Sequence, residues 1–99
     1  MNLEEAQKAV DQWIKAHGGY FEPSVNLARL LEESGELASD LLRKSGYLKP
    51  APGSAPNSDN EFGDVLFVLC ALANQHGVSL ADALSESLAR YNRRDQHRH

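Results

Sequence analysis

Residues 24–46, SVNLARLLEESGELASDLLRKSG, decide the fold of this 99-residue chain. Their apolar residues recur at spacings of three and four, the period of one side of an α-helix: Leu27, Leu30, Leu31, Leu37, Ala38 and Leu41. Gly46 follows the run, and glycine commonly ends a helix. The stretch therefore predicts one long amphipathic helix that begins after Pro23-Ser24.

Three further segments have helical patterns. Residues 3–17 follow Asn2, a good N-cap, and precede Gly18-Gly19. Residues 58–76 open on Ser58 and Glu61, which have the spacing of a capping box, and continue as an apolar run. A fourth helix begins after Ser79, with the stripe Leu80, Ala83, Leu84, Leu88 and Tyr91 and a basic end. Because no segment alternates like a strand, we expect an all-α, four-helix bundle-like subunit.

The remaining segments are short. Residues 49–58 contain Pro50, Pro52 and Pro56, which disfavour regular structure, so we expect a mobile loop there. Residues 95–99 form a polar tail. A chain of this length is one domain, residues 1–99.

Composition excludes several classes of function. The chain has 14 acidic and 10 basic residues and a net charge of −4, which argues against a nucleic-acid partner. The longest apolar run, residues 65–73, is too short to span a membrane. Cys70 is the single cysteine and lies in this run, so we expect a buried thiol in a reducing compartment, the cytoplasm.

The helix at 58–76 is apolar on almost every side. Within so small a chain, one bundle cannot easily cover all of these sides. We therefore expect a second copy to cover part of them, in a homodimer or a dimer of dimers.

Two pairs of carboxylates stand in otherwise apolar helices: Glu33 with Glu36, and Glu61 with Asp64. Three residues are nearly one helical turn, so the members of each pair project from one side of the helix. The first pair points away from the leucine stripe of its helix, which we interpret as the core side. If the two helices pack antiparallel with these sides facing, the four anions need a compensating cation, and hard oxygen ligands suit Mg²⁺ or Mn²⁺. Such a site suggests phosphate chemistry, although each acid alone could be a solvated surface residue.

Two helical glycines support a site at this position. Gly35 and Gly63 each precede the second acid of a pair. Glycine inside a helix costs about 1 kcal/mol relative to alanine, so a local reason is expected. Close approach of a helix or a ligand would be such a reason.

These motifs resemble a known family. The segments Glu32-Glu33-Ser34-Gly35-Glu36 and Glu61-Phe62-Gly63-Asp64, with the spacer between them, are similar to the Glu-Glu-x-x-Glu and Glu-x-x-Asp signature of the MazG-like all-α nucleotide pyrophosphohydrolases. Further matches extend the resemblance from about Gly19 to Arg98, including Gly77-x-Ser79-Leu80 and Tyr91-Asn92-x-Arg94-Asp95.

The resemblance implies an activity and a site. It implies metal-dependent cleavage of nucleoside triphosphates between the α and β phosphates, to a monophosphate and pyrophosphate, in a house-cleaning role by a helical dimer or tetramer. The metal ligands would be Glu33, Glu36, Glu61 and Asp64, and Glu32 would orient or deprotonate a water. Glu32, Glu33 and Glu36 are thus the candidate catalytic residues, with Mg²⁺ as the cofactor.

Substrate contacts are less sharply indicated. Arg94, with Arg90 or Arg98 as alternatives, is a candidate for the terminal phosphates, and Asn92 for sugar or phosphate. Each arginine could equally be a solvated helix end. Trp13, with Tyr20 or Phe21, could stack on a base, although its place on an apolar stripe also suits core packing.

Two other functions remain open from the sequence. One is the related phosphoribosyl-ATP pyrophosphohydrolase chemistry, which cleaves the same type of bond in a similar helical arrangement. The other is a non-catalytic helical dimer that binds a partner.

Overall fold

The computed structural model describes residues 1–49 and 58–95, and its elements are four helices. They are α1 (Leu3–Ala16), α2 (Pro23–Lys44), α3 (Ser58–Gln75) and α4 (Leu80–Asp95). The all-α four-helix fold is confirmed, and the described residues contain no strand. The expected loop at 49–58 and the tail at 95–99 lie mostly outside the described residues.

The helix ends are set by local chemistry. Asn2 and Glu5 form a reciprocal capping box at the start of α1, and Pro23 occupies the first turn of α2. Ser79 Oγ accepts a hydrogen bond from the Asp82 backbone N–H at 3.2 Å. Gly77, after α3, has φ +66°, a left-handed conformation that suits glycine. The expected capping box of Ser58 involves a side chain outside the described part.

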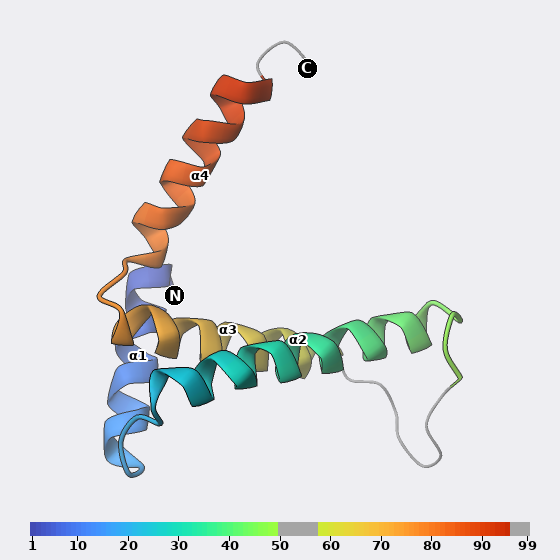
Figure 1. Ribbon diagram of the computed structural model, residues 1–99, viewed down its shortest axis with the longest axis horizontal. Helices are drawn as coiled ribbons and strands as arrows, with labels where there is room; N and C mark the ends of the chain where they lie inside the picture. The colour runs from blue at the N-terminus through green and yellow to red at the C-terminus, as the bar shows by residue number, and fades with distance from the viewer. Residues whose placement is uncertain (50–57, 96–99) are drawn as a thin grey trace.

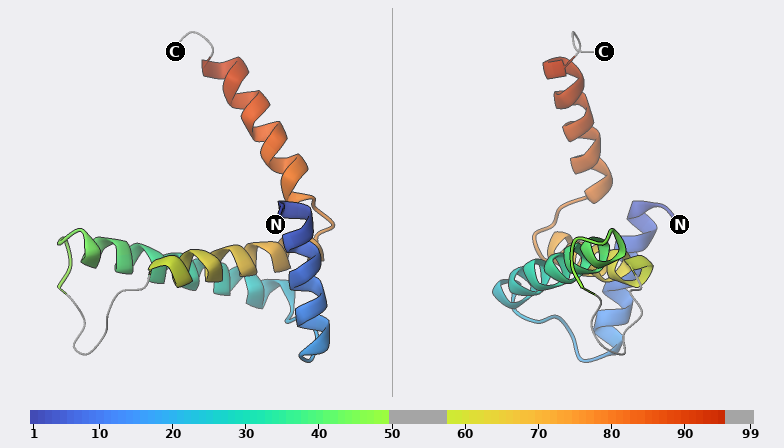
Figure 2. Two further views of the ribbon diagram at one scale, coloured as in Figure 1. Left: turned by 180° about the vertical axis from the view of Figure 1, so that it is seen from behind. Right: turned by 90° about the vertical axis from the view of Figure 1, so that its right-hand side faces the viewer.

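The helices do not close into one compact bundle within the single chain. α2 and α3 lie side by side and antiparallel, and α1 crosses them near the C-terminal end of α3 (Figures 1 and 2). Near its own N-terminal end, α4 contacts α1, and from there α4 extends away from the α2–α3 pair (Figure 1). The radius of gyration is 16.5 Å, whereas a compact domain of this length has about 13 Å.

The core is small and lies mostly on α3. Its buried apolar residues are Ile14, Val68, Cys70, Ala71 and Ala73. The interpretation of the α2 leucine stripe as core of this chain is wrong: Leu31 is 71% exposed and Leu27 is 55% exposed. α2 turns only one edge of this stripe toward α3, and there Leu30 and Leu37 are half-buried together with Glu33. The expectation of an incompletely covered α3 agrees with the exposure of Phe62, Leu66 and Leu69.

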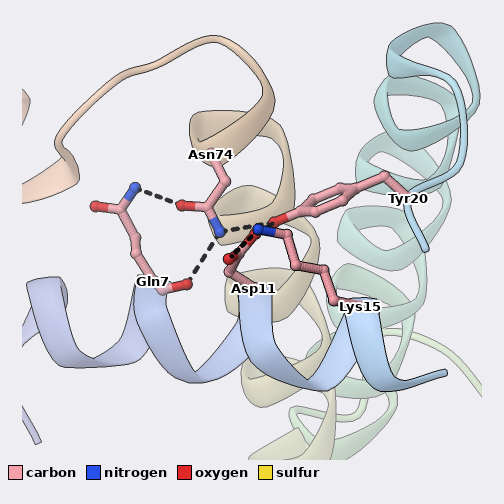
Figure 3. A network of polar contacts seen from close by, with 5 residues as sticks. All are labelled: Gln7, Asp11, Lys15, Tyr20 and Asn74. Atoms are coloured by element: carbon pink, nitrogen blue, oxygen red, sulfur yellow. Dashed lines mark hydrogen bonds and ion pairs between the residues drawn. The ribbon is translucent and has the colours of Figure 1, made fainter.

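A polar network holds α1 against the C-terminal end of α3 (Figure 3). Asn74 Nδ2 donates to the Gln7 carbonyl at 3.0 Å and to the Tyr20 hydroxyl at 3.1 Å, and Asn74 Oδ1 accepts from Gln7 Nε2. Tyr20 in turn donates to Asp11 at 2.6 Å, and Lys15 pairs with Asp11 at 3.0 Å. Every side chain in this network has a partner of complementary character.

Among the described residues, no single helix is both long and apolar enough to cross a bilayer. α3 and α4 meet the length and composition criteria only as a pair, and they are bent by 99° at the turn between them.

Candidate active site

Three of the four predicted metal ligands meet between α2 and α3. Glu33 comes from the middle of α2, and Glu61 and Asp64 come from the first turns of α3. Each offers one carboxylate oxygen, and these oxygens all lie within 4.8 Å of one another. The antiparallel pairing of the two helices brings them together, as the three-residue spacing predicts. We call Glu33, Glu61 and Asp64 the acid cluster.

The acid cluster is electrostatically unfavourable in the chain alone. Burial raises the pKa of Glu33, and the charges of Glu36, Asp64, Glu61 and Glu32 raise it further. The pKa of Glu61 is raised by burial first and then by the charges of Glu36, Asp40 and Asp64. Both carboxyls therefore favour the protonated form more than an isolated glutamate does.

Glu36, the fourth predicted ligand, lies at the edge of the cluster. Its side chain is exposed, and its carboxylate is not among the three oxygens that converge. Its charge nevertheless raises the pKa of both Glu33 and Glu61. Glu32 is also exposed and adds to the charge felt by Glu33.

The residues present fit a divalent cation. Glu61 Oε2 is buried and has no hydrogen-bond partner, which is costly for a carboxylate oxygen. Ligand oxygens of Mg²⁺ or Ca²⁺ lie 2.0–2.6 Å from the ion, so oxygens on opposite sides of one ion lie about 4 to 5 Å apart. The spacing in the acid cluster is of this size. An all-carboxylate ligand set also suits a hard cation better than zinc.

Sequence reasoning missed Asp40. It is half-buried on α2, its charge raises the pKa of Glu61, and it pairs with Arg43 at 3.5 Å. Asp40 follows Glu33 and Glu36 at positions i+7 and i+4, so helical spacing alone could have placed it beside them.

A pocket of about 420 Å³ adjoins the acid cluster. Asp64 lines it and also belongs to the cluster, so the two sites are continuous. Its remaining lining combines aromatic and polar residues from α1, α2 and α3: Trp13, Ile14, His17, Gly19, Phe21, Asn26, Arg29 and Phe67. The volume is in the range of small-molecule sites.

Trp13 belongs to this pocket and is 54% exposed, so its interpretation as a core residue is wrong. Its ring stacks on His17 at 4.0 Å between centroids and meets Phe67 edge-on at 5.6 Å. Across the pocket, the Arg29 guanidinium lies over the Phe21 ring at 5.4 Å. Tyr20, the alternative stacking residue, is engaged in the network with Asp11 and Asn74.

Asn92 and Arg94 are not brought to the acid cluster of their own chain. Both are exposed near the end of α4, the helix that extends away from α2 and α3 (Figure 1). Arg94 donates to Asp95 through Nε at 3.0 Å and Nη2 at 2.7 Å. Arg98 lies outside the described residues.

The two helical glycines are not explained by packing inside the chain. A Cβ added at Gly35 or Gly63 would meet nothing within 4 Å. The expected close approach therefore does not occur between the helices of one chain.

Comparison with known proteins identifies the family. The model of the MazG nucleotide pyrophosphohydrolase domain matches residues 21–99. The chain belongs to the MazG family. Members of this family are hydrolases, and this chain is a nucleotide pyrophosphohydrolase by membership.

Similar proteins match along nearly the whole chain. The uncharacterized protein YpjD of Bacillus subtilis (strain 168) is 39% identical over 98 residues, which cover 97% of this chain and 88% of YpjD. A crystal structure of Bacillus subtilis YpjD superposes with a TM-score of 0.79 at 36% identity, covering 93% of this chain and 96% of that one. The Bacillus-conserved MazG protein, a nucleotide pyrophosphohydrolase, gives a TM-score of 0.77 at 33% identity, with 93% and 90% covered.

Proposed function

We propose that this protein hydrolyses nucleoside triphosphates between the α and β phosphates in a metal-dependent reaction, giving a nucleoside monophosphate and pyrophosphate. The observation that carries the proposal is the acid cluster, in which Glu33, Glu61 and Asp64 converge within 4.8 Å and Glu61 Oε2 lacks a partner. MazG-family membership supports the reaction class. The resemblance to the family also supports a house-cleaning role on canonical or modified nucleotides.

Mg²⁺ is the proposed cofactor, and Mn²⁺ is a suitable substitute. Glu33, Glu61 and Asp64 would hold it, and Glu36 would join them after a change of side-chain conformation. When bound, the cation neutralises phosphate charge and makes water more acidic. The raised pKa values of Glu33 and Glu61 have the sign expected of carboxylates that a cation relieves.

The chain's own side chains would then position the reactants. Glu32 is exposed beside the cluster and is the candidate for orienting or deprotonating the attacking water. The pocket next to Asp64 would hold the nucleoside, with Trp13 stacked on the base. Because Asp64 lines both the pocket and the cluster, a base in the pocket places its phosphates near the proposed metal ligands.

We infer a homo-oligomer, a dimer or a dimer of dimers. The chain exposes 7359 Å², whereas a compact monomer of this size exposes about 5,600 Å². Large apolar residues on α2, α3 and α4 contribute to this excess, among them Leu31, Phe62 and Leu88. Cys70 is a buried free thiol, which agrees with a reducing compartment such as the cytoplasm.

The decisive experiment measures pyrophosphate release from a panel of standard, deoxy and modified nucleoside triphosphates with Mg²⁺, with Mn²⁺ and with chelator. Release that requires the metal and is lost in Glu36→Gln and Glu61→Gln supports the proposal. Glu86→Gln, an exposed acid on α4, is the matched control and keeps full activity. The panel also contains phosphoribosyl-ATP as the alternative substrate. Absence of pyrophosphate release from every nucleoside triphosphate would overturn the proposal.

A further inference from the structure

The pocket of about 420 Å³ beside the acid cluster contains one permanent positive charge. Within the part of the chain that the structure describes, Arg29 is the only lysine or arginine in its lining. Arg29 is half-buried on α2, among the aromatic rings of Trp13, Phe21 and Phe67. A charge in such surroundings is costly unless a carboxylate or a bound anion compensates it.

No carboxylate compensates Arg29. It forms no ion pair with any acid in residues 1–49 and 58–95, although Glu32 and Glu33 follow it at positions i+3 and i+4 on α2. Its guanidinium lies over the Phe21 ring, 5.4 Å from the centroid, and its Nη1 donates a long hydrogen bond of 3.4 Å to Asn26 Oδ1. Both partners are uncharged, so the positive charge of Arg29 remains available to an anion.

A chain of amide groups orients the partner of Arg29. Gln75 Nε2 donates to the backbone carbonyl of Phe21 at 2.7 Å, and a carbonyl oxygen can only accept. Gln75 Oε1 therefore faces the other way, and it accepts from Asn26 Nδ2 at 3.0 Å. This bond leaves Asn26 Oδ1 directed at Arg29. Because Asn26 is 2% exposed, the acceptor that positions the guanidinium is itself held in place.

The side chains of α2 follow the order of the parts of a nucleotide. Asn26 and Arg29 line the pocket, and Glu33, about one turn further along α2, belongs to the acid cluster. At 1.5 Å per residue, Arg29 precedes Glu33 by about 6 Å along the helix axis. In a nucleoside triphosphate, the α-phosphate lies between the nucleoside and the β and γ phosphates. A nucleoside in the pocket, with its terminal phosphates at the acid cluster, therefore has its α-phosphate beside Arg29.

We propose that Arg29 binds the α-phosphate, so that the pocket recognises a nucleoside 5′-monophosphate rather than a base alone. The inference rests on the proposed function for the places of the base and of the terminal phosphates. A guanidinium can donate two parallel hydrogen bonds to phosphate oxygens, and it stabilises negative charge beside the bond that is cleaved. The monophosphate product keeps this contact and should therefore compete with the substrate.

Arg29 has two other conceivable roles, a contact with the base and a purely structural contact with Phe21 and Asn26. Neither role involves a phosphate, so loss of either contact would weaken nucleosides and nucleotides alike. The ratio of the affinities for a monophosphate and for its nucleoside therefore isolates the proposed contact.

Trp13 provides the signal for this test, because it is the only tryptophan of the chain and lines the pocket. Its fluorescence is titrated with the four deoxynucleoside 5′-monophosphates and with the four deoxynucleosides in the presence of Mg²⁺. Neither ligand contains a phosphoanhydride bond. Arg29→Gln should bind the preferred 5′-monophosphate about 10- to 100-fold more weakly, as expected for charged hydrogen bonds, and the nucleoside with unchanged affinity.

Arg93→Gln is the matched control, since it makes the same change at an exposed position on α4, and it should bind both ligands like wild type. Unchanged nucleoside affinity in Arg29→Gln also shows that the pocket is intact. Three results would refute the role of Arg29: unchanged binding of the monophosphate, equal weakening of monophosphate and nucleoside, or a wild type that binds neither.

Deoxynucleoside 3′-monophosphates separate a local contact from general attraction between charges. They have the same charge as the 5′ isomers, but their phosphate is attached at a different carbon of the sugar. Wild type should prefer the 5′ isomer, and Arg29→Gln should lose most of this preference. Equal weakening of both isomers would contradict a contact with the α-phosphate.

Steady-state kinetics separate this inference from the proposed reaction. In Arg29→Gln, kcat/KM should fall about tenfold or more, and the inhibition constant of the monophosphate product should rise by a similar factor. An unchanged inhibition constant would contradict the inference. A wild type that cleaves no nucleoside triphosphate would refute the reaction, whereas the affinity ratios need no turnover and decide the role of Arg29 separately.

Discussion

α3 carries polar side chains at both of its ends, and the two ends are built differently. At the C-terminal end, Asn74 bonds to Gln7 and Tyr20 in a network where each group has a partner. At the N-terminal end, Glu61 and Asp64 meet Glu33 with no positive charge among the three. The first arrangement stabilises the fold, whereas the second costs stability until something binds, which is the expected sign of a functional site.

The largest effect should come from Glu61→Gln, which removes a charge from the acid cluster. We expect pyrophosphate release to fall by about 100-fold or more, because a metal ligand is lost. The melting temperature of the metal-free protein should stay the same or rise. A variant that unfolds at lower temperature would show that the cluster stabilises the fold and would remove the contrast with Asn74.

Asn74→Ala should disrupt the polar network at the C-terminal end of α3. It removes three hydrogen bonds, two donated and one accepted, and leaves Gln7 without its side-chain partner. We expect a loss of about 2 to 3 kcal/mol in unfolding free energy, measured by urea denaturation. Gln12→Ala, an exposed position on α1, is the control. Activity per folded molecule should be nearly unchanged.

Trp13→Leu sharpens the comparison on α1, where Trp13 faces the pocket and Asp11 belongs to the network. Loss of base stacking is worth about 1 to 3 kcal/mol, so KM should rise by about tenfold or more with a smaller change in kcat. Steady-state kinetics measure both constants. An unchanged KM would exclude stacking on Trp13.

Glu33→Gln should reveal the repulsion through pH. The pKa of Glu33 is raised above its ordinary value near 4.5, so between the two values the folded chain binds more protons than the unfolded chain. Stability from this group therefore falls as pH rises. The melting temperature of Glu33→Gln minus that of wild type should increase from pH 5 to pH 7.5 without metal, and Mg²⁺ should reduce the difference. A difference independent of pH and metal would contradict the cluster.

Tyr20→Phe should give the smallest effect, with the opposite dependence on pH. The Tyr20 hydroxyl and then Lys15 lower the pKa of Asp11 below 3.8, so this contact stabilises the fold above that pH and is lost as pH falls through the lowered value. We expect a cost of about 1 kcal/mol near pH 7, for the hydroxyl's hydrogen bonds, and a smaller cost in acid. Thermal melts at several pH values measure it, and a cost that grows in acid would refute the assignment.

The contrast also shows what the sequence could predict. The starts of α1 and α4 were readable because they depend on neighbouring residues: Asn2 accepts from the Glu5 backbone N–H and Ser79 from that of Asp82, each within one turn. The acid pairs were readable because helical spacing fixes their sides. Trp13 was proposed as a base-stacking residue because of its aromatic ring, and its place in the pocket agrees with that proposal.

Contacts between distant segments could not be predicted in the same way. The Gln7–Asn74 bonds join residues 67 positions apart and depend on how α1 crosses α3. The apolar period of α2 predicted the helix but not which of its sides faces α3, because part of the leucine stripe is not buried within one chain. Asn26, which does not belong to the stripe, is 2% exposed.

Cys70 is a natural probe of how often the inner face of α3 becomes accessible to solvent. The thiol is fully buried, and burial raises its pKa, so a thiol reagent can modify it only when the structure opens. Cys70 also lines a mostly apolar groove that lies between α1 and α3. The rate at which a thiol reagent labels Cys70 therefore measures how often the helices around this thiol separate. No probe has to be introduced into the chain.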